Sequence, residues 1–259
     1  MGIQYVVRKA THVGRGHLVD FVNRQDAHSL FDGEISGQHT IIGIICDGCS
    51  EGTASEVGAS LASAFLVREI SSLLELGVSA SVVPNVLYPE LLNFLRQITS
   101  TYPFVSPADR VTFIKNTLLF TVVGFILTEV ETVVFTAGDG TIVLNDQVTY
   151  IDADNSPSYP AYHLVDRSVL EHQASPLPDG FDTNVYPTTD LFHLAIGSDA
   201  WHEEQELIDH IWGFKHPSGL QRRINQWSKT DHRFRDDVTI ITVEVVNLPE
   251  GEEDHASGN

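Results

Sequence analysis

Five aspartates in this chain stand where a predicted β-strand begins or ends, which is a position from which carboxylates can do acid–base or metal chemistry. They are Asp26, Asp47, Asp139, Asp199 and Asp236. Strand ends on one side of a sheet can converge, so these carboxylates can gather although they are far apart in the sequence. A cluster of unpaired carboxylates in a partly buried site is strongly self-repelling. Such a cluster therefore predicts a partner of positive charge.

Two divalent cations would remove that repulsion. Ligation by oxygen alone, with the backbone carbonyl of Gly48 and water completing the shell, suits Mg²⁺ or Mn²⁺ better than zinc. Two such ions about 3.5–4 Å apart can share a carboxylate and lower the pKa of a bridging water. The hydroxide that results is able to attack a phosphomonoester in line.

Three of the five aspartates also have a purely structural explanation. Asp139-Gly140 is a good hairpin turn, Ser198-Asp199 can cap a helix that begins at Trp201, and Asp236 can punctuate the start of a strand. Spacing alone leaves both interpretations open.

The aspartates need elements to position them, and the apolar pattern predicts a mixed α and β protein. The run Ile41–Ile45 is rich in β-branched residues, which indicates a strand buried on both faces. The T-x-x-E spacing of Thr53 and Glu56 indicates a capping box that opens a helix running to about Leu76. We expect a second helix at 82–100, a helix at 220–227, a hairpin of strands 117–128 and 131–137, and strands at 191–196 and 238–246.

Two stretches show little periodicity. Residues 152–189 hold five prolines and predict a long surface excursion with one short helix near Val169, a kind of loop that often borders a site. Residues 248–259 are acidic, and we expect a flexible tail there, after one domain that spans residues 1–247.

Composition excludes some classes of function. The 259 residues are 42% hydrophobic, which indicates a folded globular protein, and 35 Asp and Glu against 15 Lys and Arg give a net charge of −20. That charge argues against a nucleic-acid partner. The best apolar run, Thr117 to Leu127, is too short to span a bilayer. We expect a cytoplasmic monomer with no membrane partner.

The aspartate-bearing segments together resemble the motifs of the metal-dependent protein phosphatases of the 2C type, and specifically their compact bacterial branch. The matches come in family order and cover nearly the whole chain. They are Gln25-Asp26-Ala27; Ile45-Cys46-Asp47-Gly48 with Ser50 and Glu56-Val57-Gly58-Ala59; Ala137-Gly138-Asp139-Gly140-Thr141; Ala195-Ile196-Gly197-Ser198-Asp199-Ala200-Trp201; and Asp236-Asp237-Val238-Thr239.

The resemblance implies a four-layer α-β-β-α sandwich of two antiparallel sheets flanked by helices. It implies hydrolysis of phosphoserine or phosphothreonine in a phosphorylated protein, by water activated at a dinuclear Mn²⁺ or Mg²⁺ centre. Carried across, Asp47 would bridge both ions and the Gly48 carbonyl would bind one. Asp199 and Asp236 would complete the other, Asp26 would act through bound water, and Asp139 would help to hold a weaker third ion. The resemblance thus makes Asp47 and Asp199 the candidate catalytic residues.

The sequence departs from the family pattern at two functional places. Cys49 stands where many members have a histidine that can protonate the leaving group. The segment before Asp26 lacks the family's phosphate-holding arginine, which leaves Arg15, His17 and Arg24 as candidates. These departures keep a second hypothesis open, a catalytically silent binding or regulatory module. A phosphatase of small phosphometabolites, with its pocket shaped by the proline-rich loop, is a third.

Overall fold

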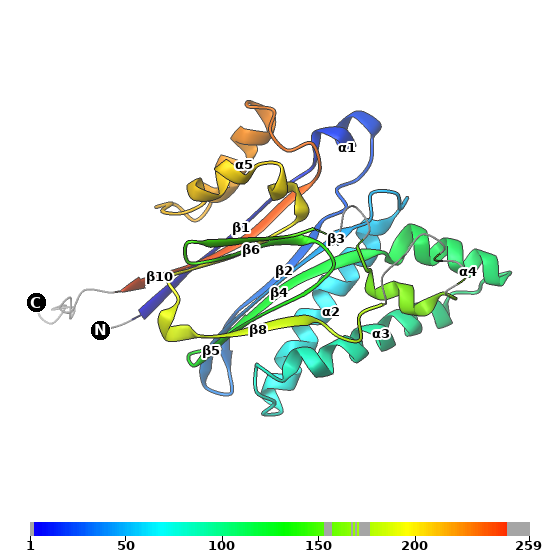
Figure 1. The fold of residues 1–259 in the computed structure, drawn as a ribbon, viewed down its shortest axis with the longest axis horizontal. Coiled ribbons are helices and arrows are strands. Elements are labelled where there is room, and N and C mark those ends of the chain that lie inside the picture. Colours follow the sequence, from blue (N-terminus) through cyan, green and yellow to red (C-terminus); the bar gives the residue numbers. More distant parts are fainter. Residues whose placement is uncertain (1–2, 153–156, 167, 169, 171–176, 248–259) are drawn as a thin grey trace, which may run out of the picture.

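The apolar runs of the sequence form two antiparallel five-stranded sheets (Figure 1). The computed structural model describes residues 3–152, 157–166, 168, 170 and 177–247. The first sheet has the order β1 (Ile3–His12), β10 (Val238–Asn247), β9 (His193–Gly197), β6 (Gly140–Leu144) and β7 (Gln147–Ile151). The second has the order β2 (Ala27–Ile35), β3 (Gln38–Gly48), β4 (Phe120–Leu127), β5 (Glu131–Ala137) and β8 (Asp182–Pro187).

Helices cover the outer face of each sheet. Helices α2 (Ser55–Glu75) and α3 (Val83–Thr101) pack on the second sheet, and α5 (Gly219–Lys229) packs on the first (Figure 1). The shorter described helices are α1 (Arg15–Asp20), α4 (Pro107–Phe113), the π-helix η1 (Ile114–Leu118), and the 3-10 helices η2 (Pro160–Leu164), η4 (Thr188–Asp190), η5 (Asp199–His202) and η6 (Gln205–His210). The predicted four-layer α-β-β-α sandwich is therefore confirmed.

Strand β3 is buried on both faces, as its run of β-branched residues predicts. Ile41 and Ile45 point into the core between the two sheets, together with Phe125 of β4. Ile42 and Ile44 point the other way, into the core under α2 and α3. All five side chains are fully buried, so this strand anchors both hydrophobic layers that meet at the second sheet.

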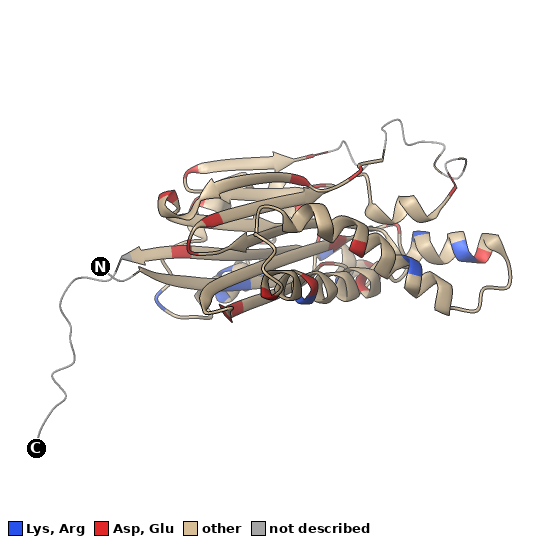
Figure 2. Cartoon of the chain, turned by 90° about the horizontal axis from the view of Figure 1, so that it is seen from below, with Lys and Arg blue, Asp and Glu red and all other residues tan. Residues whose placement is uncertain are grey.

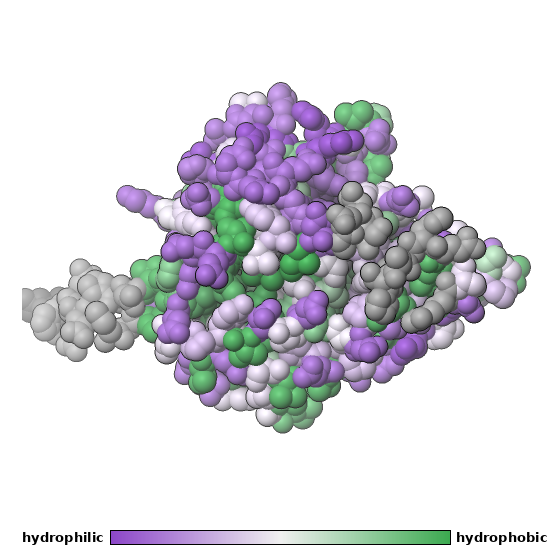
Figure 3. Space-filling view, viewed as in Figure 1, coloured by the Kyte–Doolittle hydropathy of each residue, from purple (hydrophilic) through white to green (hydrophobic). Residues whose placement is uncertain are grey.

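Helix α2 follows the predicted range, but the capping box was wrong. Its N-cap residue is Ala54, which has no side chain that can accept a hydrogen bond. Helix α2 is long and apolar enough to cross a membrane, by length and composition alone. The expectation from the sequence considered only the run from Thr117 to Leu127 as a possible span. The apolar face of α2, however, packs against β2 and β3 through Ala62, Leu66 and Ile70, as in a core helix. The face of the molecule seen in Figure 3 is largely hydrophilic over α5, with hydrophobic side chains gathered between that layer and β8.

The segment that carries Asp139 is not a hairpin turn. Strand β5 belongs to the second sheet and β6 to the first, so Gly138-Asp139 carries the chain from one sheet to the other. Gly138 and Gly140 have φ values of +89° and +155°, which side-chain-bearing residues rarely adopt. The turn explanation for Asp139 is therefore replaced by a crossover between the sheets.

The proline-rich segment holds more regular structure than its sequence predicts. Residues 152–189 contain η2 and the edge strand β8, and the predicted helix near Val169 lies outside the described residues, as does the acidic tail. The strand predicted at 117–128 begins only at Phe120, because α4 and η1 occupy residues 107–118.

Candidate metal centre

The antiparallel pairing of β2 with β3 brings Asp26 and Asp47 together. Ala27 pairs with Cys46, so the residue before β2 and the residue near the end of β3 lie next to each other across the ladder. Asp26 is 2% exposed, and neither of its carboxylate oxygens makes a well-aligned hydrogen bond, although the Thr239 hydroxyl and the Asp47 carboxyl lie beside them. A buried carboxylate in that condition is costly unless a cation joins it.

The first sheet supplies its own pair of aspartates at the same end of the sandwich. Strand β9 leads into Asp199, and β10 is preceded by Asp236. Their strands are tied together where Ser198 donates its N–H to the Thr239 carbonyl and its hydroxyl accepts the Thr239 N–H, both at 3.1 Å. Asp236 has an exposed side chain, so it stands at the mouth of the group.

The electrostatics show that these four carboxylates form one group. Burial raises the pKa of Asp47 well above its usual range, and the charges of Asp26, Asp199 and Asp236 raise it further. Burial and Asp236 likewise raise the pKa of Asp199. Burial, with the charge of Asp237, raises the pKa of Asp26 to about 7. The group therefore has the uncompensated negative charge and the oxygen-only donor set that fit Mg²⁺ or Mn²⁺.

Gly48 and Asp139 flank this group. A Cβ at Gly48 would lie 2.8 Å from the Ser55 hydroxyl and 3.0 Å from the Gln25 carbonyl, so the chain there is closely packed and needs glycine. Gly138 contacts Thr121, which pairs with Asp47. The crossover that carries Asp139 therefore lies at the same end of the second sheet, and Asp139 itself is buried.

The structure adds Asp237, which was not among the predicted site residues. This residue is 2% exposed, and its carboxylate accepts the backbone N–H groups of Gly14, at 2.6 Å, and of Gln25. It thus joins the segments after β1 and before β2 to the start of β10. The paired acids Asp236-Asp237 were the only signal available in the sequence.

His17 also takes a position that differs from its predicted role. Its Nδ1 lies 3.0 Å from Asp237 Oδ1, and its Nε2 lies 3.7 Å from Asp236 Oδ1. One ligand atom from each of His17, Asp236 and Asp237 lies within 4.8 Å of the others, a spacing that a metal ion can use. His17 therefore lies beside Asp236 and Asp237, where it could contact a metal ion as well as a phosphate.

Both candidate arginines donate hydrogen bonds to backbone carbonyls. Arg24 donates its Nε–H to the Asp26 carbonyl at 3.0 Å, which holds it beside the acidic group. Arg15 is exposed, and its guanidinium reaches the His232 carbonyl at 3.4 Å. Of the two, Arg24 is the better placed to meet a phosphate.

An aromatic residue, Tyr159, lies beside Cys49 at one side of the carboxylate group. Cys49 is half-buried, and the hydroxyl of Tyr159, from the residue before η2, lies in hydrogen-bonding contact with its thiol. Burial, Cys49 and then Asp47 raise the pKa of Tyr159. Residues 152–189 therefore do border the acidic group, as their loop character suggested. Ala200, which follows Asp199, is not among the described residues with positive φ, so its side chain causes no backbone strain there.

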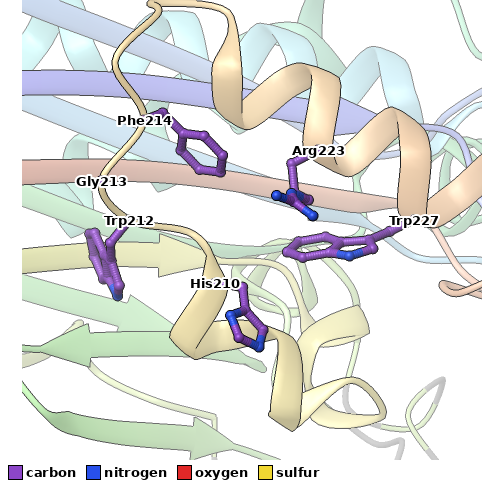
Figure 4. A pocket seen from close by; sticks show the side chains of 6 residues that line it. All are labelled: His210, Trp212, Gly213, Phe214, Arg223 and Trp227. Carbon is purple, nitrogen blue, oxygen red and sulfur yellow. The ribbon is translucent and has the colours of Figure 1, made fainter.

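A separate cavity of about 400 Å³ lies between η6 and α5 (Figure 4). None of the predicted site residues lines this cavity. The residues that line it lie on the outer side of the first sheet and are His210, Trp212, Gly213, Phe214, Arg223 and Trp227. It belongs to a different part of the molecule from the carboxylate group.

Solved structures share this architecture although the sequences have diverged. A bacterial serine phosphatase superposes with a TM-score of 0.61 at 17% identity, over 95% of this chain and 100% of that one. The serine/threonine phosphatase Stp1 from Staphylococcus aureus gives 0.60 at 17% identity, over 95% and 97% of the two chains. The PP2C phosphatase domain of SpoIIE from Bacillus subtilis gives 0.51 at 16%, over 95% and 65%.

No protein-family model matches the sequence, and a search of curated proteins finds no match. What the structures establish is the fold: the chain is built as the bacterial serine/threonine phosphatases of the PP2C type are built.

Proposed function

We propose that this protein is a metal-dependent serine/threonine protein phosphatase that hydrolyses phosphomonoesters at a dinuclear Mn²⁺ or Mg²⁺ centre. The observation that carries the proposal is the gathering of Asp26, Asp47, Asp199 and Asp236 at one end of the sandwich, where burial and neighbouring carboxylate charges raise the pKa of Asp26, Asp47 and Asp199. A phosphorylated protein is the substrate class, because the structural neighbours are described as serine or serine/threonine phosphatases.

We assign a role to each residue from its position in the carboxylate group. Asp47 is the central ligand, since it lies beside Asp26 and between the carboxylates of both sheets. The Gly48 carbonyl, Asp199 and Asp236 would be further ligands, Asp26 would act through bound water, and Asp139 would help to hold a weaker third ion. Ions bound there would supply an activated water. Arg24 and His17 are the groups that would orient the phosphate.

The test is hydrolysis of a phosphothreonine peptide by the purified protein with Mn²⁺, with Mg²⁺ and with a chelator. We expect turnover that depends on metal and is lost in Asp47→Asn. Asp231→Asn, which changes an exposed aspartate outside the group, is the matched control and keeps full activity. Turnover that persists in the chelator would overturn the proposal.

A second candidate is a catalytically silent module that binds a partner with the same surface. It is favoured by one observation: Arg15 and Arg24, the arginines of the segment before Asp26, each donate a guanidinium N–H to a backbone carbonyl of the chain. Calorimetry separates the two candidates. A protein that neither binds Mn²⁺ nor turns over a phosphopeptide supports the silent module, whereas metal-dependent turnover excludes it. Bound Mn²⁺ without turnover points to a phosphatase with a narrower substrate.

A further inference from the structure

A groove of about 610 Å³ lies between helix α2 and the strand β2, and Lys9 of β1 contributes to its wall. Lys9 and Arg68 are exposed at its rim, His28 is half-buried in it, and Phe31 with Val67 supplies apolar surface. None of the five aspartates assigned to the metal centre lines this groove.

The groove concentrates positive charge on a strongly acidic protein. Only 15 residues of the chain are Lys or Arg, against 35 acids, and Figure 2 shows how sparse the basic residues are. Lys9 and Arg68 line the groove, and Arg24 lies near enough for its charge to act on His28. Glu75, at the end of α2, is the acid among the lining residues. An anionic ligand meets favourable charge here that it would meet at few other places on this surface.

His28 provides an unused polar group inside the groove. Its Nδ1 is buried and has no hydrogen-bond partner among the described residues. A buried nitrogen left without a partner is unfavourable, and a bound polar group would relieve that cost.

The backbone beside the groove is also available. Strand β2 lies at the end of its sheet, and β3 is its only neighbour among the described strands. An edge strand presents N–H and C=O groups that an added strand can pair with. Ser29 and Phe31 lie on this edge strand and line the groove, so backbone pairing and side-chain contacts are offered together.

We propose that this groove binds an extended acidic segment of a partner protein, which adds as a strand to the free edge of β2. Its carboxylates pair with Lys9 and Arg68, one of its polar groups meets Nδ1 of His28, and its apolar residues pack on Phe31 and Val67. This proposal does not depend on phosphatase activity, because both its geometry and its test concern binding alone.

The experiment measures fluorescence anisotropy of a labelled peptide of alternating glutamate and valine, about twelve residues long, with the full-length protein. We expect saturable binding that weakens as salt rises and falls at least tenfold in the double variant Lys9→Glu, Arg68→Glu. The matched control Lys229→Glu makes the same kind of charge change on an exposed lysine of α5 and keeps the wild-type affinity. Equal loss in the control would show non-specific charge attraction and overturn the proposal.

Two further measurements test the binding mode and the occupant. The same peptide with alternate backbone nitrogens methylated cannot pair as a strand, and we expect it not to bind; equal binding contradicts strand addition. Slower amide exchange over residues 27–35 with the unmodified peptide supports it. Removal of residues 248–259 should leave the affinity unchanged. A gain of tenfold or more would identify the chain's own acidic tail as the occupant and overturn the assignment to a partner.

Discussion

Nδ1 of His17 lies 3.0 Å from Oδ1 of Asp237, although 219 other residues separate the two in the chain. Helix α1 is held in this place by backbone hydrogen bonds from Arg15 to Phe234 and from Gly16 to Arg235. A Cβ at Gly14 would lie 2.2 Å from the carbonyl carbon of Asp236, so only glycine allows so close an approach. The contact therefore joins segments from near the start and near the end of the chain at the carboxylate group.

Replacement of Asp237 by alanine should destabilise the protein strongly. Its buried carboxylate accepts the N–H groups of Gly14 and Gln25, and both donors would lose a partner. We expect the free energy of unfolding to fall by about 2–4 kcal/mol in urea denaturation. Asp231→Ala, an exposed aspartate nearby in sequence, should change it by less than about 0.5 kcal/mol. A loss in Asp237→Ala as small as this control would show that the two loops do not need the carboxylate.

The strands that carry the aspartates could be predicted from the sequence, but the contact between His17 and Asp237 could not. Ile41–Ile45 has no polar residue, and a strand buried on both faces is the natural result. His17 and Asp237 meet through tertiary contacts between the two ends of the chain, which leave no local pattern. Strand β8 also could not be predicted from the sequence. Its side chains are nearly all exposed, so the strand lacks the alternation of buried apolar and exposed polar residues that identifies a strand.

Charge repulsion in the metal centre predicts an unusual effect of a neutral substitution. In the presence of a chelator, Asp47→Asn removes a buried carboxylate whose pKa is raised by burial and by the charges of Asp26, Asp199 and Asp236. We expect the metal-free variant to unfold with a free energy about 1–3 kcal/mol larger than that of the wild type. Added Mn²⁺ should stabilise the wild type and leave the variant nearly unchanged. A variant less stable than the wild type in chelator would show that the carboxylate is paired in some other way.

The same group predicts how the metal-free protein responds to pH. Asp26, Asp47 and Asp199 have raised pKa values, so each binds its proton more tightly in the folded than in the unfolded state. Protonation therefore favours the fold, and the free energy of unfolding should fall as pH rises from about 4 through about 7, where Asp26 titrates.

Chemical denaturation in chelator at several pH values measures this slope, and Asp26→Asn should flatten it. With Mn²⁺ present the stabilisation by metal should grow over the same range, because the ligands must lose their protons to bind. A metal-free stability that rises with pH would contradict the raised pKa values.

Gly58 sets how closely α2 approaches η1. A Cβ there would lie 2.0 Å from the Thr117 carbonyl oxygen, a backbone atom that cannot move aside alone. Gly58→Ala should therefore destabilise the protein by about 2 kcal/mol or more, despite the higher helix propensity of alanine. Gly180→Ala is the matched control, since a Cβ at Gly180 would meet no atom within 4 Å, and it should be neutral or slightly stabilising. Equal thermal unfolding of the two variants would refute the close approach.

Tyr88 is buried in the core under α3 with its ring at 5.0 Å, edge to face, from that of Phe181. Its hydroxyl has no hydrogen-bond partner among the described residues, and burial, with the charge of Asp179, raises its pKa to about 12. The neutral phenol is therefore favoured in the folded state. Its contribution to stability is kept below about pH 10 and lost as pH rises from there to about 12.

Tyr88→Phe should remove this part of the alkaline loss, and near neutral pH it should raise the free energy of unfolding by about 1 kcal/mol, because no buried hydroxyl is left unpaired. Urea denaturation at about pH 7 and at about pH 11 measures both effects. Tyr102→Phe, at a tyrosine that is 55% exposed, controls for the loss of a phenol and should change neither value. If Tyr88→Phe is less stable than the wild type at both pH values, the hydroxyl has a partner after all, and the raised pKa has another cause.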